Sequence, residues 1–183
     1  MRVRSSAILA LLVLNCVPTQ AQSGSGFAWP HHQKLTWDDF QGSPPKSVSY
    51  PSAVSDTGFK YQLVCRNGLL DIDVAAFFSP SGSWVKPDSK TPELLRHEQG
   101  HFNMAELYAL KLRKAILDAK AGCGDTAKAN AAGEKMVSQF QKQWQDAERA
   151  YEEGTKYGTD LGKQEAASAR IATDLQAMSA YRQ

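Results

Sequence analysis

The chain has 183 residues, of which 42% are hydrophobic and 22% charged, which suits one folded domain with short appendages. Its 21 Lys and Arg residues nearly balance 19 Asp and Glu residues, so the composition excludes a strongly basic nucleic-acid-binding protein. Beyond the first twenty residues, no apolar stretch is long enough to cross a bilayer, and we expect no membrane span.

The first residues are typical of a secretory signal peptide. Arg2 and Arg4 give a basic start, the stretch Ala7–Leu14 is apolar, and Ala21 ends a segment suited to cleavage. The apolar stretch is much too short to be a membrane anchor. We therefore expect residues 1–21 to be a cleaved signal peptide and the mature protein to be periplasmic or secreted.

Removal of this segment changes both the charge and the cysteine count. The mature chain has 19 basic and 19 acidic residues, so we expect neither nucleic acid nor an anionic membrane as a partner. Cys65 and Cys123 remain, and in an oxidising compartment they most simply form one disulfide; the alternative is two free buried thiols. A lipoprotein anchored through Cys16 is disfavoured by Asn15, because a small residue is expected before a lipidated cysteine.

The N-terminal part of the mature chain is irregular in pattern. Residues 22–33 are expected to be a flexible lead-in, and residues 34–183 a single domain. In the run KLTWDDFQG, Trp37 and Phe40 are three residues apart, which suggests a short turn or helix that packs into the core. Residues 43–55 are rich in proline and serine and predict an irregular surface loop.

Two stretches of alternating apolar residues predict strands, Thr57–Cys65 and Leu69–Phe78. Asn67 and Gly68 between them predict a hairpin turn, because both residues tolerate positive φ. Ser83–Val85 is expected to be a third short strand. Together these segments predict a small antiparallel sheet.

The apolar spacing becomes helical after the strands. Thr91 suits the N-cap and Pro92 the first position of an amphipathic helix that should end near Ala119. Further helices are expected over residues 127–151 and 163–178, separated by a glycine-rich break. Strands followed by three helices predict an α+β fold.

The run HEQGH in the first helix is the motif that carries chemistry. His97 and His101 are four residues apart, so both imidazoles leave one helix face and can hold a single metal ion. In zinc peptidases with this arrangement, a glutamate in the position of Glu98 takes a proton from water that the metal activates. The alternative is a pair of core histidines with hydrogen-bonded partners. The position near the start of an amphipathic helix, on its buried side, favours the metal site.

A catalytic zinc usually has three protein ligands and a water, and no histidine follows His101 in the chain. Glu106 points away from the histidine face and is expected to support a ligand or the fold rather than bind metal. The candidates for the third ligand are two histidines of the lead-in and four residues of the glycine-rich segment and its approach: His31, His32, Glu152, Glu153, Tyr157 and Asp160.

Three stretches resemble a bacterial family of uncharacterised exported proteins described as predicted secreted zinc-dependent proteases. They are LTWDDFQGSPP at residues 35–45, LLRHEQGHF at 94–102 and YEEGTKYGTDLGKQ at 151–164. The resemblance implies a zincin-like metallopeptidase domain over residues 34–183, with a small antiparallel sheet, a long HExxH helix and two further helices. It also implies Zn²⁺ as cofactor and a peptide or protein as substrate.

The third stretch both fits the family and departs from it. The residues that fit are Tyr151, Glu152, Thr155, Gly158 and Gln164. Tyr157 stands where the family pattern has a histidine, so the resemblance makes Tyr157 the first choice for the third ligand. A tyrosine binds zinc as a phenolate, and its reference pKa near 10 makes this harder at neutral pH.

Two hypotheses of different class follow. The first is an exported zinc metallopeptidase in which His97, His101 and Tyr157 bind Zn²⁺ and Glu98 is the general base. The second is a non-catalytic zinc-binding periplasmic module with a degenerate peptidase site. A small helical envelope protein without metal is a third and weaker alternative.

Overall fold

The computed structural model of the chain describes residues 27–28, 34–46 and 51–182. The expected signal peptide, Cys16, His31 and His32 lie outside these residues. The strands are β1 (Phe27–Ala28), β2 (Ala53–Val54), β3 (Thr57–Arg66), β4 (Leu69–Phe78) and β5 (Trp84–Val85). The helices are α1 (Pro92–Ala119), α2 (Thr126–Gly154) and α3 (Leu161–Ala177), with short 3-10 turns η1 (Trp37–Asp39), η2 (Pro87–Ser89) and η3 (Ser179–Tyr181). The order of elements confirms the predicted α+β class.

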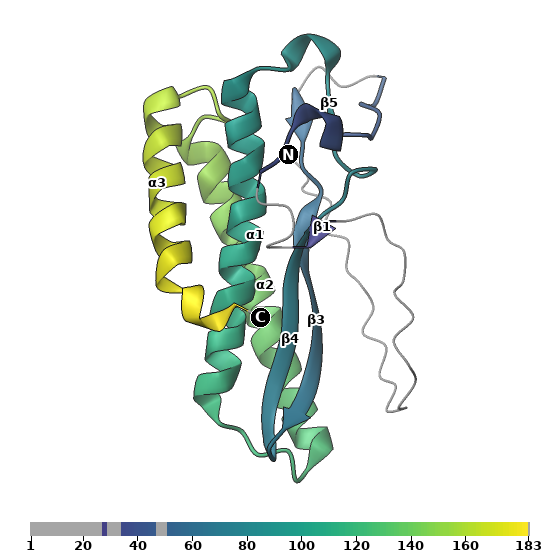
Figure 1. Ribbon diagram of the computed structural model, residues 1–183, viewed down its shortest axis with the longest axis vertical. Helices are drawn as coiled ribbons and strands as arrows, with labels where there is room; N and C mark the ends of the chain where they lie inside the picture. The colour runs from purple at the N-terminus through teal and green to yellow at the C-terminus, as the bar shows by residue number, and fades with distance from the viewer. Residues whose placement is uncertain (1–26, 29–33, 47–50, 183) are drawn as a thin grey trace.

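The β3–β4 hairpin is the main β structure, and Figure 1 shows it as a long antiparallel ribbon beside the helices. Its turn has positive φ at both Asn67 and Gly68, as the sequence predicted. β1 adds to the free edge of β4, giving the order β1-β4-β3. Residues 27–28, inside the expected flexible lead-in, are therefore a paired strand.

A second, two-stranded sheet is formed by β2 and β5, which pair antiparallel. The predicted short strand at residues 83–85 thus pairs with β2 rather than with the hairpin. β2 itself lies inside residues 43–55, where we expected an irregular loop. Neither strand has more than two residues, so local sequence alternation carries too little information to show the pairing.

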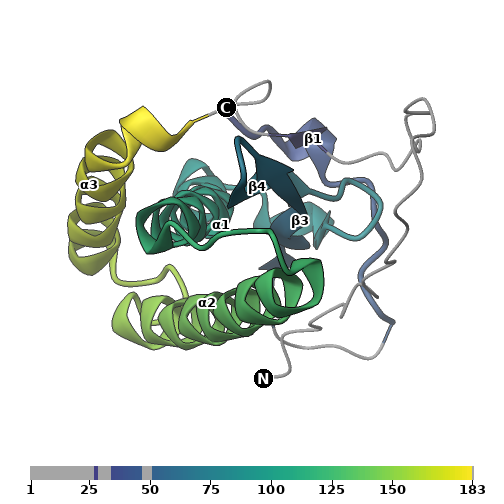
Figure 2. The ribbon, with the colours of Figure 1, turned by 90° about the horizontal axis from the view of Figure 1, so that it is seen from below.

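Helix α1 is the centre of the fold. Its N-terminus forms as predicted, because the Thr91 side chain accepts a hydrogen bond from the backbone N–H of Leu94 and Pro92 takes the first helical position. In Figure 2, α1 lies in the middle, with the β3–β4 hairpin on one side and α2 and α3 around the others. The faces of α1 that meet these elements include His97, Glu98 and His101, which is why these polar side chains of the HEQGH run are buried.

The apolar core is divided into three clusters, and α1 contributes to all of them. One cluster joins α1 to the hairpin and α2 through Leu112 and Ile116, both fully buried. A second contains Phe102 and Phe40, and the η1 turn confirms that the Trp37 region packs into the core. The third joins α1 to α2 and α3 through residues such as Tyr151 and Ile171.

The predicted disulfide between Cys65 and Cys123 is present and links the end of β3 to the connection between α1 and α2. Backbone hydrogen bonds reinforce the same junction, from Leu70 N–H to the Ala121 carbonyl and from Cys123 N–H to the Gly68 carbonyl. Among the described residues, no helix is long and apolar enough to cross a membrane.

Replacing both cysteines with alanine should lower the free energy of unfolding by about 4 kcal/mol, because the bond closes a loop of 58 residues in the unfolded chain. Urea denaturation of the wild type and of the double variant, both purified under oxidising conditions, measures the difference. The backbone hydrogen bonds at the junction should preserve the native far-UV circular dichroism. An unchanged free energy of unfolding would show that the disulfide does not constrain the unfolded chain.

Candidate metal centre

The two histidines of the HEQGH run lie side by side in the interior. His97 is 3% exposed and His101 7%, and their ring centroids are 4.8 Å apart in an edge-to-face arrangement. The two Nε2 atoms are 3.3 Å apart. The i, i+4 spacing therefore does bring the two nitrogens to one point, as the motif predicted.

Helix α2 brings a carboxylate to the same point. Glu152 Oε2 lies 3.4 Å from His97 Nε2, and Glu152 Oε1 lies 3.6 Å from His101 Nε2. One nitrogen of each histidine and one oxygen of Glu152 lie within 4.8 Å of one another, which makes these three residues a candidate metal-binding group.

The hydrogen bonds of the Nδ1 atoms set which nitrogen of each imidazole can bind a metal. His97 Nδ1 lies 2.9 Å from Gln164 Oε1, and His101 Nδ1 contacts the carboxylate of Glu148. The amide nitrogen of Gln164 donates to the Tyr151 hydroxyl, so its oxygen faces His97 as an acceptor. Since both partners are acceptors, both Nδ1 atoms carry a hydrogen, and Nε2 is the nitrogen of each ring that is left for a metal ion.

The separation of the two histidine nitrogens agrees with the size of a zinc site. Tetrahedral zinc with bonds of about 2.0–2.1 Å requires its nitrogen ligands to be about 3.3–3.4 Å apart. The two Nε2 atoms are 3.3 Å apart, and Glu152 places a different oxygen near each of them, Oε2 at 3.4 Å from His97 and Oε1 at 3.6 Å from His101. Two histidines and one glutamate are a donor set of catalytic zinc sites, so the residues present fit the metal.

The charge around the imidazoles also favours a cation. Burial acts to lower the pKa of His101, but the carboxylate of Glu148, helped by Glu98 and Glu152, outweighs burial and raises that pKa to about 9. Burial acts to raise the pKa of Glu152, yet its contacts with the two histidines hold the pKa below its usual range. Three carboxylates around the two rings therefore favour positive charge at this point, carried by an imidazolium or by a divalent cation that replaces its proton.

Helix α2 supports the centre as well as supplying a ligand. Glu148 and Glu152 are four residues apart and so lie on one helix face, which is turned toward α1. Trp144, one turn earlier, donates from Nε1 to Glu148 Oε1 at 3.0 Å. Glu148 was not among the predicted site residues. The available signal was its position in the expected helix, four residues before the candidate ligand Glu152.

Gly100 and Gly158 allow the backbone to pack closely against Tyr151 and His97. The Tyr151 ring stacks on His97 at 4.9 Å, and its hydroxyl donates to the His97 carbonyl. A Cβ atom on Gly100 would lie 1.9 Å from the Tyr151 hydroxyl oxygen. Gly158 has a φ of +78°, and a Cβ there would lie 2.8 Å from the His97 ring. A larger residue at Gly158 would displace the His97 side chain, and one at Gly100 would displace the Tyr151 ring that stacks on it.

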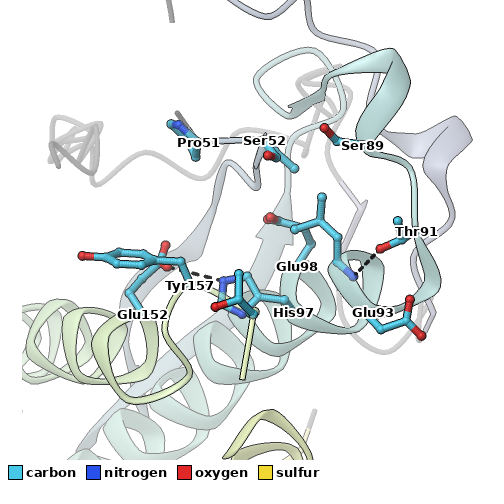
Figure 3. A pocket seen from close by; sticks show the side chains of 13 residues that line it. Pro51, Ser52, Ser89, Thr91, Glu93, His97, Glu98, Glu152 and Tyr157 are labelled. Carbon is cyan, nitrogen blue, oxygen red and sulfur yellow. Dashed lines mark hydrogen bonds and ion pairs between the residues drawn. The ribbon is translucent and has the colours of Figure 1, made fainter. Parts of the chain in front are cut away.

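The structure brings Glu152, rather than the first-choice Tyr157, to the two histidines. Tyr157 follows the end of α2 in a turn with a φ of +58°, and it is 39% exposed. In Figure 3 its hydroxyl end points away from His97, whereas Glu152 is joined to His97 by a dashed line. The physical reason is that Glu152 is still on the helix face that meets α1, whereas the chain reverses before Tyr157.

The remaining candidates have other positions. Glu153 is exposed, and Asp160 caps α3 by accepting a hydrogen bond from the Lys163 N–H. Glu106 is buried away from the donor cluster, with Arg182 Nε 3.9 Å from its carboxylate. Burial raises the pKa of Glu106 to about 7 although Arg182 opposes the shift. This position agrees with the expectation that Glu106 supports the fold.

A pocket of about 310 Å³ opens onto the cluster. His97, Glu98 and Glu152 form one side of it, and residues 51–53 with Ser89 form the opposite side (Figure 3). Glu98 is 3% exposed and accepts a hydrogen bond of 2.6 Å from the Ser55 hydroxyl. Burial raises the pKa of Glu98, while His101 and Ser55 oppose the shift. A buried carboxylate thus lies beside the metal-binding group, inside a cavity that a ligand can enter.

Residues 82–158 match a family described as a bacterial protein of unknown function (DUF922). The match covers less than half of the chain, and it includes all three donors and Glu98. No curated protein and no solved structure matches the chain. The family description states no activity.

Exchanging Glu152 for glutamine should weaken zinc binding by at least about 100-fold, because a neutral amide replaces the only charged donor of the set. Tyr157→Phe should leave zinc affinity within about twofold, because the phenol is outside the donor cluster. Competition against a fluorescent zinc chelator measures both variants, with Glu153→Gln as the matched control. The opposite ranking, with the loss in Tyr157→Phe, would make Tyr157 the ligand.

Proposed function

We propose that the protein is an exported zinc-dependent peptidase. In this proposal His97, His101 and Glu152 bind Zn²⁺, and Glu98 is the general base. The observation that carries it is the position of Glu98, a buried carboxylate beside a candidate metal-binding group of two histidines and a glutamate, at the wall of an open pocket.

Each residue of the site has a task in amide hydrolysis. The zinc, when bound, supplies the Lewis acidity that makes water more acidic and polarises the carbonyl of the substrate. Glu98 takes a proton from the attacking water as the water oxygen bonds to the carbonyl carbon. It then gives the proton to the amine nitrogen as the C–N bond breaks. Because burial raises the pKa of Glu98, its carboxylate is a better proton acceptor than an exposed glutamate.

The ligands are held by groups that do not touch the metal. Glu148 and Gln164 accept hydrogen bonds from the Nδ1 atoms of His101 and His97, which keeps both Nε2 lone pairs on the metal side. Such partners preserve the geometry of the site while charge develops on the substrate. They support a site prepared for catalysis rather than an incidental histidine pair.

The pocket suits an extended peptide. Ser52 pairs with Lys86 through a backbone hydrogen bond, so in the antiparallel register the polar backbone groups of Ala53 point away from β5. Ala53 also lines the pocket, and β2 is paired on one edge only among the described residues. A peptide segment can therefore add to this edge as a strand and place a carbonyl near Glu98.

Export is supported by two features. The first residues have the pattern of a signal peptide, and the Cys65–Cys123 disulfide is typical of proteins that fold in an oxidising compartment. The alternative of a non-catalytic zinc-binding module was based on the lack of a third histidine. Glu152 offers a third donor that is not a histidine, which supports the peptidase.

The test is proteolysis by the protein purified after export and loaded with zinc. With an unfolded, reduced protein as substrate, the wild type should cleave, and Glu98→Gln should cleave at least about 100-fold more slowly while keeping one zinc per chain. Glu165→Gln, an exposed change on α3, is the control and should behave as the wild type. A zinc-loaded wild type as inert as Glu98→Gln would favour the non-catalytic module.

A further inference from the structure

The contact between Ser55 and Glu98 joins two distant parts of the chain. Ser55 lies in the two-residue connection between β2 and β3, and its hydroxyl donates to Glu98 Oε2 at 2.6 Å. Glu98 is on α1 and 3% exposed, so water does not readily replace this donor. A buried carboxylate that loses such a donor is destabilised and tends to change its rotamer.

The backbone around Ser55 is fixed on both sides. Before it, Val54 pairs with Trp84 in the β2–β5 sheet. After it, the Asp56 N–H donates to the Ser83 hydroxyl, and the Asp56 carbonyl accepts from the Ser79 N–H, each at 2.9 Å. Ser83 is fully buried. The Ser55 hydroxyl is therefore presented by a segment anchored at both ends, and its direction is set before a substrate arrives.

We propose that Ser55 is a positioning residue that holds one oxygen of Glu98 so that the other is the oxygen that exchanges protons. This proposal rests on the proposed peptidase function. A proton passes from the attacking water to Glu98 Oε1 as the water oxygen bonds to the carbonyl carbon. The same proton leaves Oε1 for the amine nitrogen when the C–N bond breaks. The Ser55 proton stays on its oxygen throughout.

The location of Ser55 also predicts which kinetic constant it affects. Residues 51–53 of the same segment line the pocket, but Ser55 does not, and its hydroxyl is directed to Glu98. Its contribution should therefore appear in the chemical step and not in substrate binding. A residue that merely stabilised the segment would affect KM and the thermal midpoint instead.

Three variants of the zinc-loaded, exported protein test the proposal: Ser55→Ala, Ser55→Thr and Ser81→Ala. Ser55→Ala should lower kcat about 10- to 100-fold, the range for loss of a hydrogen bond to a charged group, with KM and zinc content within about twofold. Ser55→Thr keeps the hydroxyl and should retain kcat within about threefold. Ser81→Ala, in the exposed turn after β4, should match the wild type.

A double variant separates action through Glu98 from an independent effect. In a Glu98→Gln background, Ser55→Ala should cause no further loss of the residual rate, because the carboxylate that it positions is gone. An additive loss, a change in KM alone, or failure of Ser55→Thr to retain kcat would each overturn the proposal.

A crystal structure tests whether Ser55 positions Glu98 without any measurement of turnover. In a crystal structure of the zinc-loaded Ser55→Ala variant, the Glu98 carboxylate should turn from its wild-type position while the ligands stay in place. A carboxylate that does not move would overturn the role of Ser55. An inert wild type would contradict the peptidase function, and the same pair of structures would still decide whether Ser55 positions Glu98.

Discussion

The burial of two imidazoles between α1 and α2 is the constraint on which the rest of the structure depends. A buried imidazole needs partners for both nitrogens, and here Glu148 and Gln164 satisfy the Nδ1 atoms of His101 and His97. The Nε2 atoms then face each other at 3.3 Å with Glu152 beside them. This arrangement gathers two imidazole nitrogens and a carboxylate at one point, where a divalent cation can replace a proton.

Three separate segments of the chain contribute residues to the candidate metal site and its surroundings. α1 supplies the histidines, α2 the third donor, and the connection from β2 to β3 the hydrogen bond to Glu98. Close packing needs the glycines, since Gly100 makes room for Tyr151 and Gly158 for His97. The disulfide and the hairpin fix the distant end of α1, so the helix has a defined position when α2 packs on it.

Much of this could be predicted from local sequence. The N-cap at Thr91, the turn at Asn67 and the i, i+4 spacing of the histidines each depend on a few neighbouring residues, and all three appear in the structure. The ligand from α2 could not be chosen in this way. Glu152 and Tyr157 are five residues apart, and the choice depends on where α2 ends and which face meets α1. Those are properties of tertiary packing.

Dependence on tertiary packing also explains the other features that could not be predicted from the sequence. The β2–β5 pairing and the Ser55–Glu98 contact join segments about 30 and 43 residues apart through very short elements. Within the helix, the carboxylate that orients His101 was missed because Glu148 is one of several charged residues in an amphipathic pattern. Its role becomes visible only when α2 is placed against α1.

The most direct test of the central claim is an anomalous difference map, recorded at the zinc absorption edge, from crystals of the protein grown with zinc. The account predicts one strong peak about 2.0–2.2 Å from His97 Nε2, His101 Nε2 and one oxygen of Glu152, with Tyr157 outside bonding distance. A peak bonded to the Tyr157 hydroxyl, or no peak between the two histidines, would contradict it.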